Sequence, residues 1–219
     1  MKIACLADIH GCDWQRWTPP EADVLVLAGD LFGFRDPQKC LAEFKIAAAK
    51  WPLPVVVVAG NHDFVLETFQ EWPSNVHYLQ DSSTVIKGLT FYGTPWTPRC
   101  GKWAFQASES MLGKLFKRIP LAVDVLVTHG PSFGILDSNN NSNLGSIALH
   151  DAIYNNITQG GNLKLHIFGH IHEARGQRFV DYPSAKASYY AINCASPALS
   201  VVVHDLKQQQ QLIGELSGF

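Results

Sequence analysis

Five short segments, far apart in the sequence, carry side chains that could bind two metal ions. Each contains aspartate, histidine or both, and each follows an apolar run that predicts a β-strand. The segments are Asp8-Ile9-His10, Gly29-Asp30, Gly60-Asn61-His62-Asp63, Thr128-His129-Gly130 and Gly169-His170-Ile171-His172. Imidazole combined with carboxylate and amide oxygen favours Mn, Fe, Zn, Ni or Co over calcium, which prefers oxygen throughout. A centre of this composition would activate water for attack on a phosphorus ester.

The spacing within two of these segments supports a shared ligand role. Asp8 and His10 are two residues apart, as are His170 and His172. On an extended segment, such spacing points both side chains in the same direction. Taken singly, each segment also fits a polar strand end without any metal, because short motifs often match by chance. Their number and their order together predict the metal site.

The bulk properties predict one ordered domain over residues 1–219, with 206–219 as a candidate peripheral tail. The chain has 219 residues, of which 47% are apolar, enough for a sizeable core. Its net charge of −2 argues against a surface that binds polyanions. We find no signal peptide and no membrane-spanning run, and the five cysteines form no CxxC pair, which favours reduced thiols. We therefore expect a cytoplasmic protein that does not contact membranes.

Apolar runs alternate with helical patterns along the chain, which indicates the α/β class. The predicted helices are 37–50, capped by Asp36 and started by Pro37, and 66–72, 108–118 and 144–157. The predicted strands are 2–7, 24–28, 55–59, 76–79, 84–86, 90–92, 123–127, 163–168, 189–193 and 200–204. The three short strands within 76–92 favour a meander, and the polar residues 132–143 a mobile loop.

This order of elements predicts two mixed β-sheets packed face to face and flanked by helices. In open α/β sheets, ligands bind beyond the carboxyl ends of the strands. All five polar segments lie at such ends if 163–168 is a strand. The fold would therefore gather the candidate ligands at one edge of the sheets.

The ordered motifs DxH, GD, GNHD, THG and GHxH resemble the calcineurin-like metallophosphoesterase superfamily over residues 8–172. A second stretch is similar to the metallophosphoesterase-domain-containing subgroup. It comprises residues 92–98 (YGTPWTP), Trp103-Ala104-Phe105, and Thr128 to Pro131 with Gly134 and Asp137. The resemblance implies a four-layer α/β/β/α sandwich. Members of this subgroup are linked to nucleotide binding and to hydrolysis of cyclic nucleotides or other phosphodiesters.

The resemblance also implies roles for the candidate ligands. These are Asp8, His10 and His172 for one metal, Asn61, His129 and His170 for the other, and Asp30 as the bridge between them. We expect two divalent transition-metal ions, manganese first, with Fe, Zn, Ni or Co as alternatives. A hydroxide shared by two cations about 3.5–4 Å apart would attack the phosphorus in line.

His62 is the candidate general acid, which would protonate the leaving oxygen; a purely structural role is its alternative. Asp63 would be structural, because adjacent side chains on an extended segment point apart. The protein-phosphatase branch of the family carries GDxVDRG, whose second Asp orients the acid histidine. Gly33 stands at that position here. Protein dephosphorylation is therefore disfavoured, and the group that orients His62 stays open.

Several other side chains could contact the substrate. Arg175 could bind phosphate through its planar fork, and Trp96 or Phe133 could stack on a base, as could Trp103. Packing roles compete with each of these interpretations. Asn193 could support the ligands through hydrogen bonds.

The predicted activity is hydrolysis of a small phosphodiester or nucleotide by a dinuclear metal enzyme. One alternative is a nucleotide- or metal-binding regulatory protein with weak catalysis, which would bind metals but turn over no model diester. Another is a nuclease of the same superfamily, which the short, slightly acidic chain disfavours and salt-dependent DNA binding would favour. Nucleic acid is therefore not an expected partner, and the oligomeric state stays open.

Overall fold

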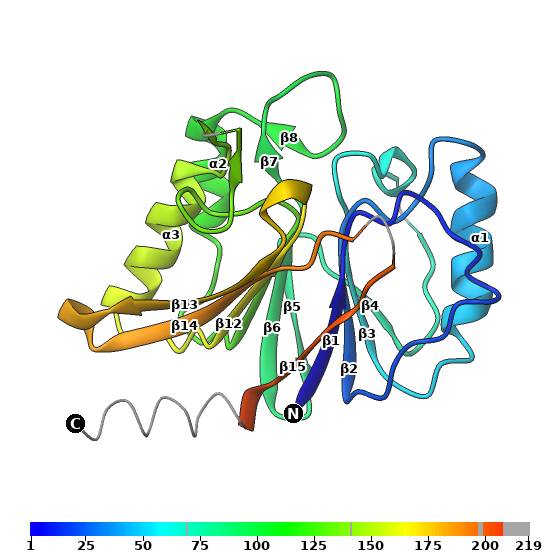
Figure 1. The fold of residues 1–219 in the computed structure, drawn as a ribbon, viewed down its shortest axis with the longest axis horizontal. Coiled ribbons are helices and arrows are strands. Elements are labelled where there is room, and N and C mark those ends of the chain that lie inside the picture. The colour runs from blue at the N-terminus through cyan, green and yellow to red at the C-terminus, as the bar shows by residue number, and fades with distance from the viewer. Residues whose placement is uncertain (69, 141, 197–198, 208–219) are drawn as a thin grey trace.

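Two β-sheets lie face to face in the computed structural model, which describes residues 1–68, 70–140, 142–196 and 199–207 (Figure 1). The strands of the first sheet, in spatial order, are β15 (Val202–Asp205), β1 (Lys2–Leu6), β2 (Val24–Ala28), β3 (Val55–Val58) and β4 (Val76–Tyr78). Strands β1 to β4 run parallel, and β15 is antiparallel to β1 at the edge.

The second sheet also has a parallel centre with antiparallel edges. Its strands, in spatial order, are β13 (Gly176–Tyr182), β14 (Ala187–Asn193), β12 (Leu165–Phe168), β9 (Val125–Thr128), β6 (Leu89–Thr94) and β5 (Ser82–Ile86). Strands β14, β12, β9 and β6 are parallel, whereas β13 and β5 pair antiparallel with their neighbours. Two small ladders join β7 (Thr97–Pro98) to β8 (Gln106–Ala107), and β10 (Ser138–Asn139) to β11 (Ser142–Asn143).

Three α-helices cover the outer faces of the sheets. Helix α1 (Pro37–Ala48) lies on the first sheet, and α2 (Glu109–Phe116) and α3 (Ile147–Thr158) lie on the second (Figure 1). Each begins at a side-chain cap, because Asp36, Ser108 and Ser146 accept a hydrogen bond from the backbone N–H three residues further on. The predicted α/β class and the four-layer arrangement are confirmed.

The core between the sheets follows from the apolar strands. On β2, Val24, Val26 and Ala28 face the second sheet, whereas Leu25 and Leu27 face the layer that contains α1. All five are fully buried, which explains why this run is apolar throughout rather than alternating. The first sheet is therefore buried between the second sheet on one face and helix α1 on the other.

Several sequence predictions in the middle of the chain were wrong. Instead of a helix at 66–72, the described part of this segment has only a 3₁₀ turn, η1 (Phe64–Leu66). Seven residues before a proline offer too few hydrogen bonds to offset helix nucleation. The meander at 76–92 is also absent: β4 joins the first sheet, and β5 and β6 form a hairpin in the second. Asp81, with φ of 49°, lies at the turn between the sheets.

Other differences concern edges and loops. Residues 132–143 are not wholly irregular, because Asp137 accepts hydrogen bonds from the backbone N–H groups of Gly134 and Gly145 and the small β10–β11 ladder follows. Strand β13 was missed, since it lies at the sheet edge with most of its residues exposed and shows no regular alternation of apolar and polar residues. Helix α3 starts three residues later than predicted.

Leu206, at the start of the predicted tail, is buried between the sheets, and residues 208–219, with the glutamine run, lie outside the described residues. Among the described residues, no helix has both the length and the apolar character needed to cross a bilayer.

We predict that Gly93→Ala destabilises the fold, because Gly93 packs closely against side chains of the facing sheet. A Cβ there would lie 2.3 Å from Leu79 Cβ and 2.8 Å from Val58 Cγ2. We expect a loss of about 1–3 kcal/mol in the free energy of unfolding, measured by urea denaturation. Gly113→Ala is the control: its Cβ meets nothing within 4 Å in α2, so it should stabilise by about 0.5–1 kcal/mol. Equal effects of the two variants would contradict this account of Gly93.

Candidate metal centre

All five polar segments lie at the carboxyl ends of parallel strands, as predicted. Strands β1, β2 and β3 of the first sheet end at Leu6, Ala28 and Val58, just before the DxH, GD and GNHD motifs. Strands β9 and β12 of the second sheet lead into the THG and GHxH motifs. The loops that follow these strands meet along one edge of the molecule (Figure 1). Both sheets therefore contribute to one site.

The ligand loops are tight turns, not the extended segments that the sequence analysis assumed. Asp8, His10, Asp30 and His170 all have left-handed φ values, of 58°, 51°, 55° and 71°. Such values are uncommon outside glycine and are found mainly where the surrounding structure enforces them. Backbone hydrogen bonds join the loops here, from Asp8 N–H to Gly29 O (2.9 Å) and from His10 N–H to Asp30 O (2.8 Å). The turns, rather than alternation along a strand, point these side chains into the centre.

The Asp30 carboxylate lies at the middle of the cluster. Its Oδ2 atom is 3.4 Å from His129 Nε2, 3.7 Å from His62 Nε2 and 4.0 Å from His10 Nε2. Its Oδ1 atom accepts a hydrogen bond of 2.8 Å from the backbone N–H of His62. Asp30 is only 2% exposed. One buried oxygen thus faces three imidazoles, which is the arrangement a bridging ligand would need.

A first compact ligand group consists of Asp8, His10 and His172, which offer donor atoms that all lie within 4.8 Å of one another. Asp8 Oδ1 is buried and accepts no hydrogen bond of suitable geometry, although His172 Nε2 lies 3.2 Å away. Asp8 Oδ2 accepts the backbone N–H of His170. A buried carboxylate oxygen without a donor is costly unless a cation is its partner. This group therefore fits a metal ion.

A second group lies beside Asp30 and centres on His129. The Nδ1 atom of His129 lies 2.9 Å from the carbonyl of Ala28, which can only accept, so Nδ1 carries the proton. Its Nε2 atom lies 3.0 Å from Asn61 Oδ1, and Asp8, Asp30 and His129 form another compact group. A backbone carbonyl behind a histidine is a common way to orient a metal ligand. The His170 ring lies next to His129, with centroids 4.9 Å apart, but is not part of the compact groups found among the described residues.

The electrostatics of the cluster indicate a site that attracts positive charge. Burial acts to lower the pKa of His129, but the Asp30 carboxylate outweighs burial and raises it to about 10. The Asp8 carboxylate likewise raises the pKa of His172, whereas burial lowers that of His170 to about 4. A divalent cation would supply the missing charge and displace these protons, so metal affinity should increase with pH. The donor set thus fits divalent transition metals.

His62 faces this cluster through Nε2, while its Nδ1 atom is buried and has no hydrogen-bond partner among the described residues. Burial lowers its pKa. The neighbouring Asp63 is structural, as expected. It accepts hydrogen bonds from the backbone N–H groups of Leu31 and Phe32, both at 3.0 Å, and from that of Gly60 at 2.8 Å. Asp63 thereby fastens the GNHD loop to the GD loop.

Unlike the candidate metal ligands, the residues predicted to contact the substrate are mostly engaged in other contacts. The Arg175 guanidinium donates to the backbone carbonyls of Cys194, Ala195 and Ser200, so the prediction of a phosphate contact does not fit its geometry. Trp96 is also engaged elsewhere, because its Nε1 donates to Asp81 and its ring packs on Phe105.

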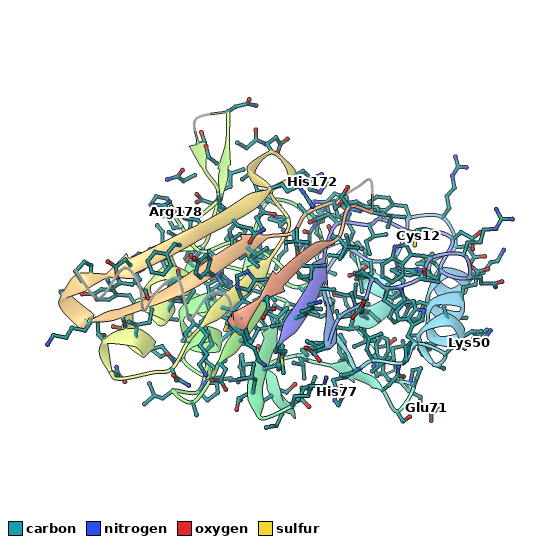
Figure 2. All side chains as sticks on the ribbon, turned by 60° about the horizontal axis from the view of Figure 1, so that its bottom comes forward. Cys12, Lys50, Glu71, His77, His172 and Arg178 are labelled. Carbon is teal, nitrogen blue, oxygen red and sulfur yellow. The ribbon has the colours of Figure 1, made fainter. Side chains whose placement is uncertain are left out.

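Phe133 is exposed but has no ring contact with the cluster among the described residues. Instead, Phe34 and Trp103 contact His62, and Phe64 contacts Trp103; of these three rings, only Trp103 was predicted as a possible substrate contact. Asn193 donates to the carbonyls of Leu136 and Ile171, which supports the GHxH segment as expected. Figure 2 shows His172 far from His77, which the sequence did not place in the site.

We predict that Asp63→Asn reduces the pH dependence of stability in the metal-free protein. Burial, and the charge of Asp30, raise the pKa of Asp63 from 3.8 to about 7, so between these pH values the folded state holds a proton that the unfolded chain releases. The free energy of unfolding should therefore fall as the pH rises from about 4 to about 7, and Asp63→Asn should lack this part of the fall. Denaturation at several pH values with chelator measures the dependence. Asp151→Asn, at an exposed position on α3, is the control and should keep the dependence of the unaltered protein; the same dependence in Asp63→Asn would contradict this account of Asp63.

Comparison with known proteins agrees with this geometry. The chain is 30% identical over 210 residues to human metallophosphoesterase domain-containing protein 1 and 29% identical over 212 residues to UPF0046 protein T07D4.2 of Caenorhabditis elegans. Each match covers 80% of this chain, but only 61% and 52% of those two relatives, so the chain spans little more than half of their length.

Solved structures share the fold at low sequence identity. A protein from Thermus thermophilus matches with a TM-score of 0.60 and 12% identity, covering 94% of this chain and 98% of that one. A dimetal phosphatase from Danio rerio matches with a TM-score of 0.52 and 13% identity, covering 88% of this chain and 87% of that one. The family model described as calcineurin-like phosphoesterase matches residues 1–174. The ligand geometry fits this match, and the chain belongs to the calcineurin-like phosphoesterase family.

Proposed function

We propose that this protein hydrolyses a small phosphodiester or nucleotide with two divalent metal ions, manganese being the first candidate. One observation carries the proposal: Asp30 Oδ2 faces three imidazoles, and the Asp8 group lies directly beside it. Asp8, His10 and His172 would hold one ion, Asn61, His129 and His170 the other, and Asp30 would join them. When bound, the ions would ionise a water and stabilise charge on the phosphoryl oxygens.

The size of the neighbouring space supports a small substrate. A cavity of about 610 Å³ opens beside His10 and is bordered by Gly33, Phe34 and Arg35. This volume is typical of sites for small molecules. Since the ligands come from both sheets, the proposal also requires residues 1–219 to act as one domain.

The chain lacks the feature that would favour a protein phosphatase. A side chain at position 33 would meet the His10 carbonyl oxygen at 2.8 Å, so the backbone leaves no room for the aspartate of that branch. Cysteine-based phosphoryl transfer is disfavoured too. Burial raises the pKa of the Cys12 thiol to about 12, and it raises that of Cys194 as well, so neither is a ready thiolate nucleophile.

Two side chains of the protein, Asp30 and His62, would take the remaining roles in the reaction. Asp30, held by the backbone N–H of His62, keeps the centre and the acid at a fixed separation. His62 would give its Nε2 proton to the oxygen of the leaving group as the P–O bond breaks. A neutral imidazole cannot donate and remain stable as an anion, so the protonated form is the working acid.

A substrate and metal panel tests the proposal. We expect hydrolysis of model phosphodiesters and cyclic nucleotides when Mn²⁺ or another transition metal is added, and its loss with chelator. Asp30→Asn should bind neither ion firmly and should lose activity, whereas Asp151→Asn should behave like the unaltered protein. Elemental analysis that finds one full metal site in Asp30→Asn would contradict the bridging role. Two bound metals without turnover of any ester would favour a regulatory binding protein.

We predict that His62→Ala lowers kcat by about 100-fold or more for substrates with poor leaving groups and leaves metal content unchanged. The loss should shrink for good leaving groups such as para-nitrophenolate, because these need no proton. Kinetics with a graded series of aryl phosphodiesters measures this dependence. An equal loss across the series would show that His62 is not the acid.

A further inference from the structure

His62 is a candidate acid without the carboxylate that would orient it. Its Nδ1 atom is buried and has no hydrogen-bond partner among the described residues. Position 33 cannot supply one, because a side chain there would collide with the His10 carbonyl. The hydrogen bond from the backbone N–H of His62 to Asp30 fixes the main chain, but it leaves the ring free to rotate about its own bonds.

Two aromatic rings occupy the space around the imidazole. The Trp103 ring centroid lies 4.3 Å from that of His62 with an interplanar angle of 59°. Phe34 lies 4.8 Å from His62 in an edge-to-face arrangement, with an angle of 87°. The two rings also contact one another, with centroids 6.2 Å apart. Contacts between aromatic rings have preferred geometries and therefore favour particular ring orientations. Together they restrict the ring to one orientation.

Both aromatic residues are fixed relative to the loop that carries His62. The backbone N–H of Ala104, next to Trp103, donates to Asn61 O at 3.0 Å. The backbone N–H of Phe32, two residues before Phe34, donates to Asp63 Oδ1 at 3.0 Å. The residues on either side of His62 therefore anchor the two segments that bear the rings. Their positions cannot drift without breaking these bonds.

The exposure of these rings also calls for an explanation. Phe34 is 64% exposed and Trp103 is 40% exposed, although both are large and apolar. A packing role alone would place such side chains deeper in the core. Both rings contact His62, and Phe34 also lines the cavity beside His10. This arrangement fits residues that serve the site rather than the stability of the fold.

We propose that Trp103 and Phe34 are positioning residues, which hold the His62 imidazole with Nε2 toward the leaving oxygen in place of the missing carboxylate. The inference rests on the proposed role of His62 as the acid. Trp103 is the sharper test, because Phe34 also stacks on His10, with centroids 6.3 Å apart and an angle of 12°. A leucine at position 103 would keep apolar bulk but remove the planar contact.

The experiment compares Trp103→Leu, Trp103→Phe and Phe179→Leu on the graded aryl phosphodiester series. Trp103→Leu should lower kcat by about 10- to 100-fold for poor leaving groups and hardly at all for para-nitrophenolate, with KM little changed. Trp103→Phe should restore most of this loss. Phe179→Leu, at an exposed aromatic position on the edge strand β13, should match the unaltered protein. Metal content should be the same in all variants.

A double-mutant cycle decides whether Trp103 acts through His62. In the His62→Ala background, Trp103→Leu should cause no further loss, because the group it positions is gone. A second readout is independent of activity: in the zinc-loaded protein, the His62 Cε1–H proton signal should shift when the Trp103 ring is removed. Additive losses, or an increase in KM alone, would overturn the inference and make Trp103 a substrate contact. If His62→Ala itself shows no leaving-group dependence, the acid role fails and this inference fails with it.

Discussion

The burial of two carboxylates, Asp8 and Asp30, sets the conditions for the rest of the centre. Each is almost inaccessible to solvent, and a buried anion is stable only when charge or hydrogen bonds surround it. The backbone provides part of this stabilisation, because the N–H groups of His62 and His170 donate hydrogen bonds to the two carboxylates. The imidazoles provide the remainder in the absence of metal, and cations would provide it otherwise. The position of every other ligand follows from the need to face these two groups.

The sequence located the candidate ligands at the ends of parallel strands, but it did not predict the loop geometry that directs their side chains. The five motifs were recognisable because buried parallel strands are nearly all apolar, so a polar residue directly after one stands out. The loop conformations could not be recognised from the sequence, because the left-handed backbone at Asp8 or His10 depends on contacts between loops that are distant in sequence. The assumption of extended segments was therefore wrong.

The residues around His62 show a similar limit. Phe34 and Phe64 carry no motif, and their proximity to Trp103 arises only when three loops fold together. By contrast, Arg175 was predicted to bind phosphate because it follows the GHxH motif. Its guanidinium N–H groups instead donate hydrogen bonds to three backbone carbonyls. Backbone acceptors cannot be counted from a sequence. Gly33 was informative in the sequence, where it replaces the aspartate of the protein-phosphatase branch, and in the structure, where no side chain fits at this position.

The division of the ligands between the two sheets has a consequence for folding. Asp8, Asp30 and Asn61 come from loops of the first sheet, and His129, His170 and His172 come from loops of the second. Bound cations would therefore act as further cross-links between the halves of the sandwich, at the edge where backbone hydrogen bonds of Ala7 with Cys194 and Ser196 already join the sheets. Part of the free energy of metal binding would appear as resistance to separation of the sheets. Metal loss and opening of the sandwich would then be steps of one coupled equilibrium, in which cellular metal supply also sets the lifetime of the folded chain.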